Sequence, residues 1–138
     1  MIRVAVYGVT EVFFGAEDDT FWRTVRAWHA ALPPMDADEI AEVERVYGGT
    51  RLRLPGDTSR PFRAPHYTTS PAGIFGRAYP GEISLATCGV LVLSAPPLLP
   101  ISILRPLPRV LRAGISQRHP AAPVALVFAF ETGRSGSR

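Results

Sequence analysis

Histidine, serine and cysteine are the side chains in this sequence that could serve as nucleophiles, general bases or metal ligands. His29, His66 and His119 show no paired spacing of the kind that a metal site or a catalytic dyad requires. Ser94 does not lie in a Gly-x-Ser-x-Gly elbow. The single Cys88 cannot form an internal disulfide and is typical of a small buried apolar residue. We therefore assign none of these side chains a catalytic or metal-binding role.

The basic side chains exclude one large class of chemistry. All 15 of them are arginine and none is lysine, so no lysine is available for a phosphate-binding loop or for any other mechanism that needs an ε-ammonium group. The formal net charge is only +3, and the arginines are spread from Arg3 to Arg138. Nucleic-acid binding usually needs a clustered basic stripe. The sequence therefore does not indicate a nucleic-acid partner.

Two blocks in the middle of the chain carry its most specific signal. The first reads RPFRAPH at 60–66, and the second reads PGEISLA at 80–86, before a glycine and an apolar run at 90–93. Together they resemble the magnesium-chelatase-like AAA+ ATPases, including the competence-protein branch. The similarity extends over roughly residues 12–131. The residues that match the family motifs are Arg60, Pro61, Phe62, Arg63, Ala64, Pro65, His66, Pro80, Gly81, Glu82 and Gly89.

The resemblance implies a nucleotide site, and the residues at its phosphate loop depart from the family pattern. Counting back from the double proline at 33–34, the loop is expected at 15–22. Of the loop's glycines, lysine and hydroxyl residue, only Gly15 is retained. Asp18 and Thr20 replace the other glycines, Phe21 replaces the lysine, and Trp22 replaces the residue that binds magnesium.

The other parts of the implied ATPase site differ too. Ser94 and Ala95 occupy the place of the family's Asp-Glu pair for magnesium and catalytic water, and Glu131 that of the sensor asparagine. The sequence also ends before the helical lid and its sensor arginine would begin. Phosphoryl transfer depends on these parts for positioning and charge neutralisation. We expect a non-catalytic, pseudo-ATPase member of the family that acts as a binding or assembly module and holds no cofactor. One alternative is a protein that binds ATP and magnesium or is a weak ATPase, and another is a decayed, poorly folding gene product.

The altered loop makes its own structural prediction. Glu17, Asp18 and Asp19 place carboxylates where phosphates would lie. Carboxylates and phosphates are both negatively charged, so they would repel each other. Asp18 or Asp19 is expected to cap the following helix, with at least one of Phe21 and Trp22 packing inward on the sheet. We expect no open, positively lined cavity at the start of this helix.

The hydrophobic pattern predicts an α/β fold. Continuous apolar runs at 90–93 and 124–130 are typical of strands buried on both faces, and 12–14 should lie parallel beside them. Together with the resemblance, this predicts a three-layer αβα core like that of P-loop NTPases, with a mostly parallel sheet and truncated at its C-terminal end. Residues 2–7 could form an edge strand, pair with 12–14 as a hairpin, or replace it as the central strand.

The expected helices cover 19–32, 36–47 and 82–86, whereas 50–80 is expected to be loop or short hairpin and prolines should prevent a regular helix through much of 96–108.

Length and composition predict a single domain over 1–131 and a disordered tail at 132–138. The sequence contains neither an 18-residue apolar stretch nor a signal peptide, so we expect a cytoplasmic protein with no membrane partner. A long irregular connection in a compact domain is often functional. We therefore expect a protein partner, with an active AAA+ subunit among the candidates, to dock through the 50–80 segment.

Overall fold

A five-stranded sheet lies at the centre of the computed structural model, which describes residues 2–7 and 10–131, and side chains from residue 12 to 131. Its strands occur in the order β1-β2-β7-β4-β3, and a separate hairpin is formed by β5 and β6. The strand bounds are β1 Ile2–Tyr7, β2 Thr10–Ala16, β3 Phe62–Arg63, β4 Val90–Ser94, β5 Ile115–Ser116, β6 His119–Pro120 and β7 Ala125–Phe130.

The central strands are parallel, as predicted. β7 lies between β2 and β4 and pairs in parallel with both, and β3 adds a short parallel pairing outside β4. β1 pairs with β2 in antiparallel orientation and lies at the sheet edge, so residues 2–7 are both an edge strand and the antiparallel partner of β2, and the placement as central strand is excluded. β2 is longer than the 12–14 segment that its apolar residues suggested.

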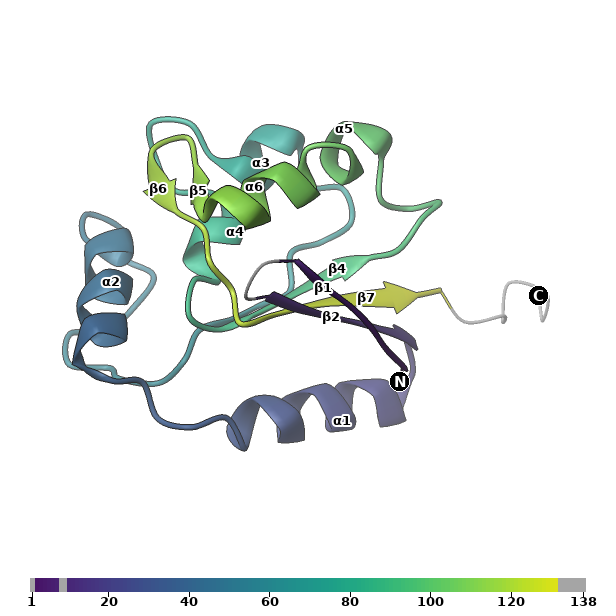
Figure 1. Cartoon of the computed structure of the whole chain (residues 1–138), viewed down its shortest axis with the longest axis horizontal. Helices are drawn as coiled ribbons and strands as arrows, with labels where there is room; N and C mark the ends of the chain where they lie inside the picture. The colour runs from purple at the N-terminus through teal and green to yellow at the C-terminus, as the bar shows by residue number, and fades with distance from the viewer. Residues whose placement is uncertain (1, 8–9, 132–138) are drawn as a thin grey trace.

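Helices cover both faces of this sheet (Figure 1). α1 (Asp19–Ala30) lies on one face, while α3 (Pro71–Phe75), α5 (Ile101–Leu104) and α6 (Leu107–Ala113) lie on the other. α2 (Ala37–Tyr47) and the short α4 (Glu82–Leu85) complete the set. The expected three-layer α/β fold is therefore confirmed. In the part of the chain that the structure describes, no helix has the length and apolar character needed to cross a bilayer.

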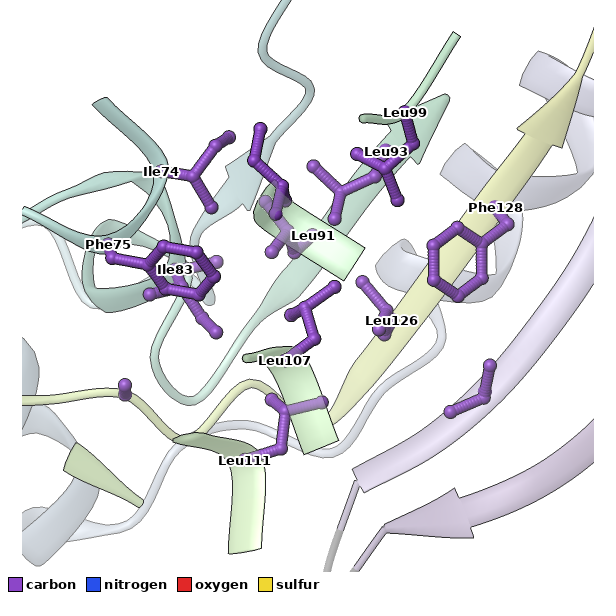
Figure 2. Close-up of a cluster of buried hydrophobic side chains, with 14 of the residues drawn as sticks. Ile74, Phe75, Ile83, Leu91, Leu93, Leu99, Leu107, Leu111, Leu126 and Phe128 are labelled. Atoms are coloured by element: carbon purple, nitrogen blue, oxygen red, sulfur yellow. The ribbon is translucent and has the colours of Figure 1, made fainter. Parts of the chain in front are cut away.

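Side chains alternate between the two faces of the sheet, as strand geometry requires. Leu91 and Leu93 of β4 belong to the cluster under α3, α5 and α6, whereas Val90 and Val92 pack on the α1 side. Figure 2 shows the first of these clusters, in which Leu107 lies close to Leu126 and Leu91. Because both faces are covered, the central strands are apolar throughout, which explains the unbroken runs in the sequence.

Helix starts follow the predicted signals. Asp36 accepts the backbone N–H of Glu39 at 2.9 Å, and the Glu39 carboxylate accepts the backbone N–H of Asp36 at 3.0 Å. This reciprocal pair is a capping box, and it fixes the start of α2. Asp18 is the N-cap of α1 and accepts the backbone N–H of Phe21.

Two segments contain more regular structure than the sequence suggested. The 50–80 segment contains β3 and the short helix α3, which Ser70 caps and Pro71 begins. The 96–108 segment contains the four-residue helix α5 and the start of α6, with Pro106 as the N-cap of α6 and Pro108 in its first turn; these pieces are short and interrupted, as the prolines predicted. The prediction of loop or short hairpin for 50–80 was wrong at α3, because proline is compatible with the first turn of a helix, whose N–H groups have no intrahelical acceptor.

Gly89 permits the chain to pass unusually close to the segment before β3. A Cβ atom on Gly89 would lie 2.0 Å from the carbonyl oxygen of Pro61. That same oxygen accepts the backbone N–H of Val90 at 2.9 Å. Gly81 is similarly restricted, because a Cβ atom there would lie 2.4 Å from the carbonyl oxygen of Ile74. Both glycines of the family motifs are thus required by close backbone contacts.

We predict that Gly89→Ala lowers the free energy of unfolding by about 1–3 kcal/mol or more, because an added methyl group forces the backbone of Pro61 away from β4. Chemical denaturation measures the change. Gly48→Ala is the matched control, since a Cβ atom there would meet its nearest neighbour at an ordinary 3.4 Å. A loss of stability at Gly89 no larger than that at Gly48 would contradict the packing described for β3 and β4.

Candidate functional site

A cavity of about 600 Å³ lies at the carboxyl ends of the parallel strands, beside the first turn of α1. Figure 1 shows the tips of β4 and β7 on the same side of the molecule as the start of α1. In open α/β sheets this edge is where ligands bind. The residues that line the cavity are Glu17, Asp18, Asp19, Trp22, Ala64, Pro65, His66, Tyr67, Val92, Leu93, Ser94, Leu98, Ala129 and Glu131.

The lining is negatively charged. Glu17, Asp18, Asp19 and Glu131 contribute carboxylates, and the lining residues include no arginine. We expected no open, positively lined cavity at the start of α1. An open cavity is present, so this expectation was wrong about the opening. The lining is negative, which is opposite to the charge that a phosphate site needs. The space is open because Trp22 lies half-buried at its side rather than filling it.

The segment expected to form a phosphate loop contains almost no loop. Gly15 and Ala16 continue β2 and pair with Ala129 and Phe130 of β7, so only residues 17 and 18 separate the strand from α1. The sheet ladder uses the backbone groups that a phosphate loop would direct at its ligand. The predicted 15–22 loop is thus the end of a strand, a two-residue link and the first helical turn.

The start of α1 is satisfied from within the chain, as predicted. Asp18 Oδ1 accepts the backbone N–H of Phe21 at 2.7 Å. The Phe21 side chain is only 4% exposed and packs in the cluster with Val25 and Val127. A carboxylate therefore occupies the position at the positive end of the helix where an anionic ligand would otherwise bind.

The structure brings together some of the sequence-predicted site residues and separates others. Asp18, Asp19, Trp22, Ser94 and Glu131 line the same cavity. The remaining four lie outside its lining: Gly15 in β2, Thr20 in the first turn of α1 on the exposed surface, Phe21 in the core, and Ala95 buried just after β4.

His66 also lines the cavity, together with Tyr67, which sequence reasoning did not select. The two rings stack with centroids 4.4 Å apart. His66 Nδ1 lies 2.7 Å from the Thr68 hydroxyl oxygen and 3.2 Å from the Thr68 backbone nitrogen, so the ring is held against the turn that follows it. Tyr67 directly follows the RPFRAPH block, whereas Leu98 carries no motif signal, because only folding brings its segment to the cavity.

Arg60, the first residue of the RPFRAPH block, joins three separate segments. Its guanidinium donates to the Glu39 carboxylate at 2.8 Å, to the carbonyl oxygen of Cys88 at 2.8 Å and to that of Pro33 at 2.6 Å. The hydrogen bonds from Arg60 lower the pKa of Glu39 below its ordinary value. Arg60 therefore has a structural role and lies outside the cavity lining.

Arg63 connects the two family blocks directly. Its Nε and Nη2 atoms donate to the two carboxylate oxygens of Glu82 at 2.8 and 3.0 Å. This paired geometry raises the pKa of Arg63 and fixes β3 against the start of α4. The other residues of the blocks make different contacts. The ring of Phe62 lies beneath the guanidinium of Arg26, and Pro80 forms a β-bridge with Gly76. Ala64 and Pro65 line the cavity.

Layers of helices around a mostly parallel sheet, with a cavity at its carboxyl edge, define a P-loop-like α/β domain. Residues 4–137 match the family model described as magnesium chelatase, subunit ChlI. The chain belongs to this family, which confirms the resemblance carried by the two blocks. No curated protein matches the chain.

We predict that the Arg63–Glu82 pair stabilises the fold cooperatively, because the two side chains are only 29% and 18% exposed. In a double-mutant cycle with Arg63→Met and Glu82→Gln, the coupling energy should lie within about 0.5–3 kcal/mol. The wider-spaced Arg53–Asp57 pair, 3.6 Å apart and more exposed on its acidic side, is the control and should couple by less than about 0.5 kcal/mol. Equal coupling in the two pairs would refute a special role for the Arg63–Glu82 link.

Proposed function

We propose that this chain is a non-catalytic member of the magnesium chelatase family, a pseudo-ATPase that acts as a binding or assembly module. The observation that carries the proposal is the charge of the cavity: its lining supplies four carboxylates, from Glu17, Asp18, Asp19 and Glu131, and no arginine. The proposal includes no ATP or magnesium cofactor.

The lining does not fit a nucleoside triphosphate. Two like charges 4 Å apart repel by about 4 kcal/mol at an effective dielectric constant of 20, and a triphosphate would meet several carboxylates at once. Family-type catalysis would need a lysine and backbone N–H groups on the phosphates. The chain has no lysine, and the Phe21 N–H is already bonded to Asp18.

A magnesium ion is not favoured at this position either. Hard cations need six or more oxygen ligands that converge on one point. Within residues 2–7 and 10–131, no group of three or more His, Cys, Asp or Glu side chains is placed to hold a metal ion. Ser94 and buried Ala95 at the end of β4 supply no carboxylate in the place of the family's Asp-Glu pair.

The 50–80 segment supports a binding role. Among the described residues, seven large hydrophobic side chains are exposed, and four of them lie in this segment: Leu52, Leu54, Tyr67 and Tyr79. Arg53 fixes the turn that presents the two leucines, since it donates to the carbonyl oxygens of Asp57, at 3.1 Å, and Ser59. We propose that a protein partner docks on this segment, with an active AAA+ subunit as one candidate.

We predict that neither the wild-type chain nor Phe21→Lys binds ATP in the presence of magnesium, because the carboxylates remain and the inserted lysine must leave the core. Isothermal titration at millimolar ATP measures binding. Phe21→Leu, which preserves the apolar packing, serves as the folding control. A dissociation constant of about 100 μM or tighter for the wild type would stabilise the fold by roughly 1.5–3 kcal/mol at millimolar ligand and would contradict the pseudo-ATPase proposal.

A further inference from the structure

Acidic residues are absent from a long part of the sequence, and the basic residues of that part are exposed. Residues 83–130 contain four arginines, Arg105, Arg109, Arg112 and Arg118, and no aspartate or glutamate. All four arginines are exposed, and none of them forms an ion pair with a described side chain. We call these four residues the basic face. Within the described part of the chain, their charges are not neutralised by a carboxylate.

The helix α6 and the turn before it place three of these charges on one side. Arg109 and Arg112 are three residues apart on α6, a spacing that makes them neighbours on the surface of a helix. Arg105 lies one turn before Arg109, and its own backbone is helical, with φ −66° and ψ −44°. Leu107 and Leu111, on the other side of α6, pack into the core. The three arginine side chains therefore project away from the core.

The β5–β6 hairpin adds the fourth arginine beside α6 (Figure 1). Its two-residue turn consists of Gln117 and Arg118, whose φ angles are 50° and 71°. Asparagine and glycine usually occupy such left-handed positions. Ser116 fixes the hairpin, because its hydroxyl donates to the carbonyl oxygen of Phe75 at 2.6 Å. Arg118 is therefore held at the hairpin tip at a conformational cost that a glycine would remove.

A cavity of about 400 Å³ lies between α6 and this hairpin. Its lining is largely apolar and includes Phe75, Val110, Ala113 and Ile115, and Arg109 of the basic face also belongs to it. Ile115 is 56% exposed, so apolar surface is accessible next to the charge. The volume lies in the range of about 300–1,000 Å³ that is typical of ligand sites. The molecule thus has an apolar recess beside a set of unpaired cations.

We infer that the basic face and this cavity together bind an acidic amphipathic segment of another protein. Carboxylates of the segment would pair with the arginines, since a guanidinium can donate two parallel hydrogen bonds to one carboxylate. An apolar side chain of the segment would enter the cavity beside Arg109 and Ile115. A nucleic acid would supply negative charge but no aliphatic side chain for the recess, so the apolar lining favours a protein segment.

This inference is independent of the proposed function. The hairpin precedes β7 in the chain, whereas the acidic cavity lies where β7 and β4 end. The two cavities share no lining residue. Failure to bind an acidic segment would therefore leave the pseudo-ATPase proposal intact, and binding of ATP would leave this inference intact.

The test measures the fluorescence anisotropy of a labelled acidic peptide, four repeats of Asp-Leu-Glu, on addition of the full chain. The salt concentration is about 0.15 M, where exposed charges further than about 8 Å apart are largely screened. The face variant is Arg105→Gln/Arg109→Gln/Arg112→Gln. The control variant, Arg23→Gln/Arg45→Gln/Arg51→Gln, changes exposed arginines elsewhere on the molecule. Both variants remove three positive charges.

We expect the wild type to bind this peptide, the face variant to bind it about tenfold or more weakly, and the control variant to lose less than about twofold, because close charge pairs contribute most to affinity. A peptide with serine in place of each leucine should bind about fivefold or more weakly, since it buries no apolar side chain in the recess. A single-stranded DNA of equal charge should also bind more weakly than the leucine peptide.

Arg118→Gly is a second variant that keeps the fold, because glycine suits a φ of 71°. We expect it to weaken peptide binding by about threefold or more while the midpoint of chemical denaturation does not fall, which separates a binding role from a structural one. Absence of peptide binding, equal weakening in the face and control variants, or equal binding of the leucine and serine peptides would each overturn the inference. DNA binding as tight as that of the leucine peptide would overturn it too, because the surface would then recognise a polyanion rather than a protein segment.

Discussion

The close passage of Pro61 against Gly89 is the contact on which the arrangement of the family blocks depends. β3 pairs with β4 through only two residue pairs, which is too short a ladder to hold a long connecting segment. The Pro61 carbonyl extends the pairing by one hydrogen bond to Val90, and this requires the absence of a Cβ atom at Gly89. Arg60 and Arg63 then tie the two ends of β3 to α2 and α4. The chain after β3 reaches the cavity as a result.

The family signal and the family chemistry are therefore carried by different parts of the chain. Arg60, Arg63, Glu82 and Gly89 hold segments together outside the cavity lining, so their structural roles do not depend on the residues of the nucleotide site. The acidic residues at 17–19 are free of that constraint, because the apolar residues of α1 that pack on the sheet begin at Phe21. Reversal of the charge in the cavity is thus compatible with an intact fold, which is the physical basis of the pseudo-ATPase proposal.

Much of the fold could be predicted from the sequence because its signals are local. The unbroken apolar runs of β4 and β7 require coverage on both faces, and the Asp36–Glu39 spacing specifies a capping box. β3 could not be predicted in this way, since two residues carry no period and their pairing depends on contacts with Gly89. The helices α3 and α6 were missed because their prolines lie in first turns, where proline is tolerated.

The site was predictable only in part, because local signals can be read from the sequence and contacts between distant segments cannot. The Asp18 cap follows from local spacing, and the structure confirms it. The open cavity does not follow, because it depends on how Tyr67, Leu98 and Glu131 meet from segments that are distant in sequence. The helical pattern also does not show whether Trp22 fills this space or lines it; in the structure Trp22 packs against the cluster under α1 and its Nε1 donates to Glu17.

Hydrogen exchange at the Phe21 amide tests the central claim most directly, namely that the chain supplies its own anion at the start of α1. This N–H donates to Asp18 Oδ1 at 2.7 Å, so we predict slow exchange in the protein alone and no change on addition of millimolar magnesium–ATP. Protection of the amides at 17–22 that appears only with the nucleotide would show that ATP occupies this helix end, and it would contradict the self-capped, charge-reversed cavity.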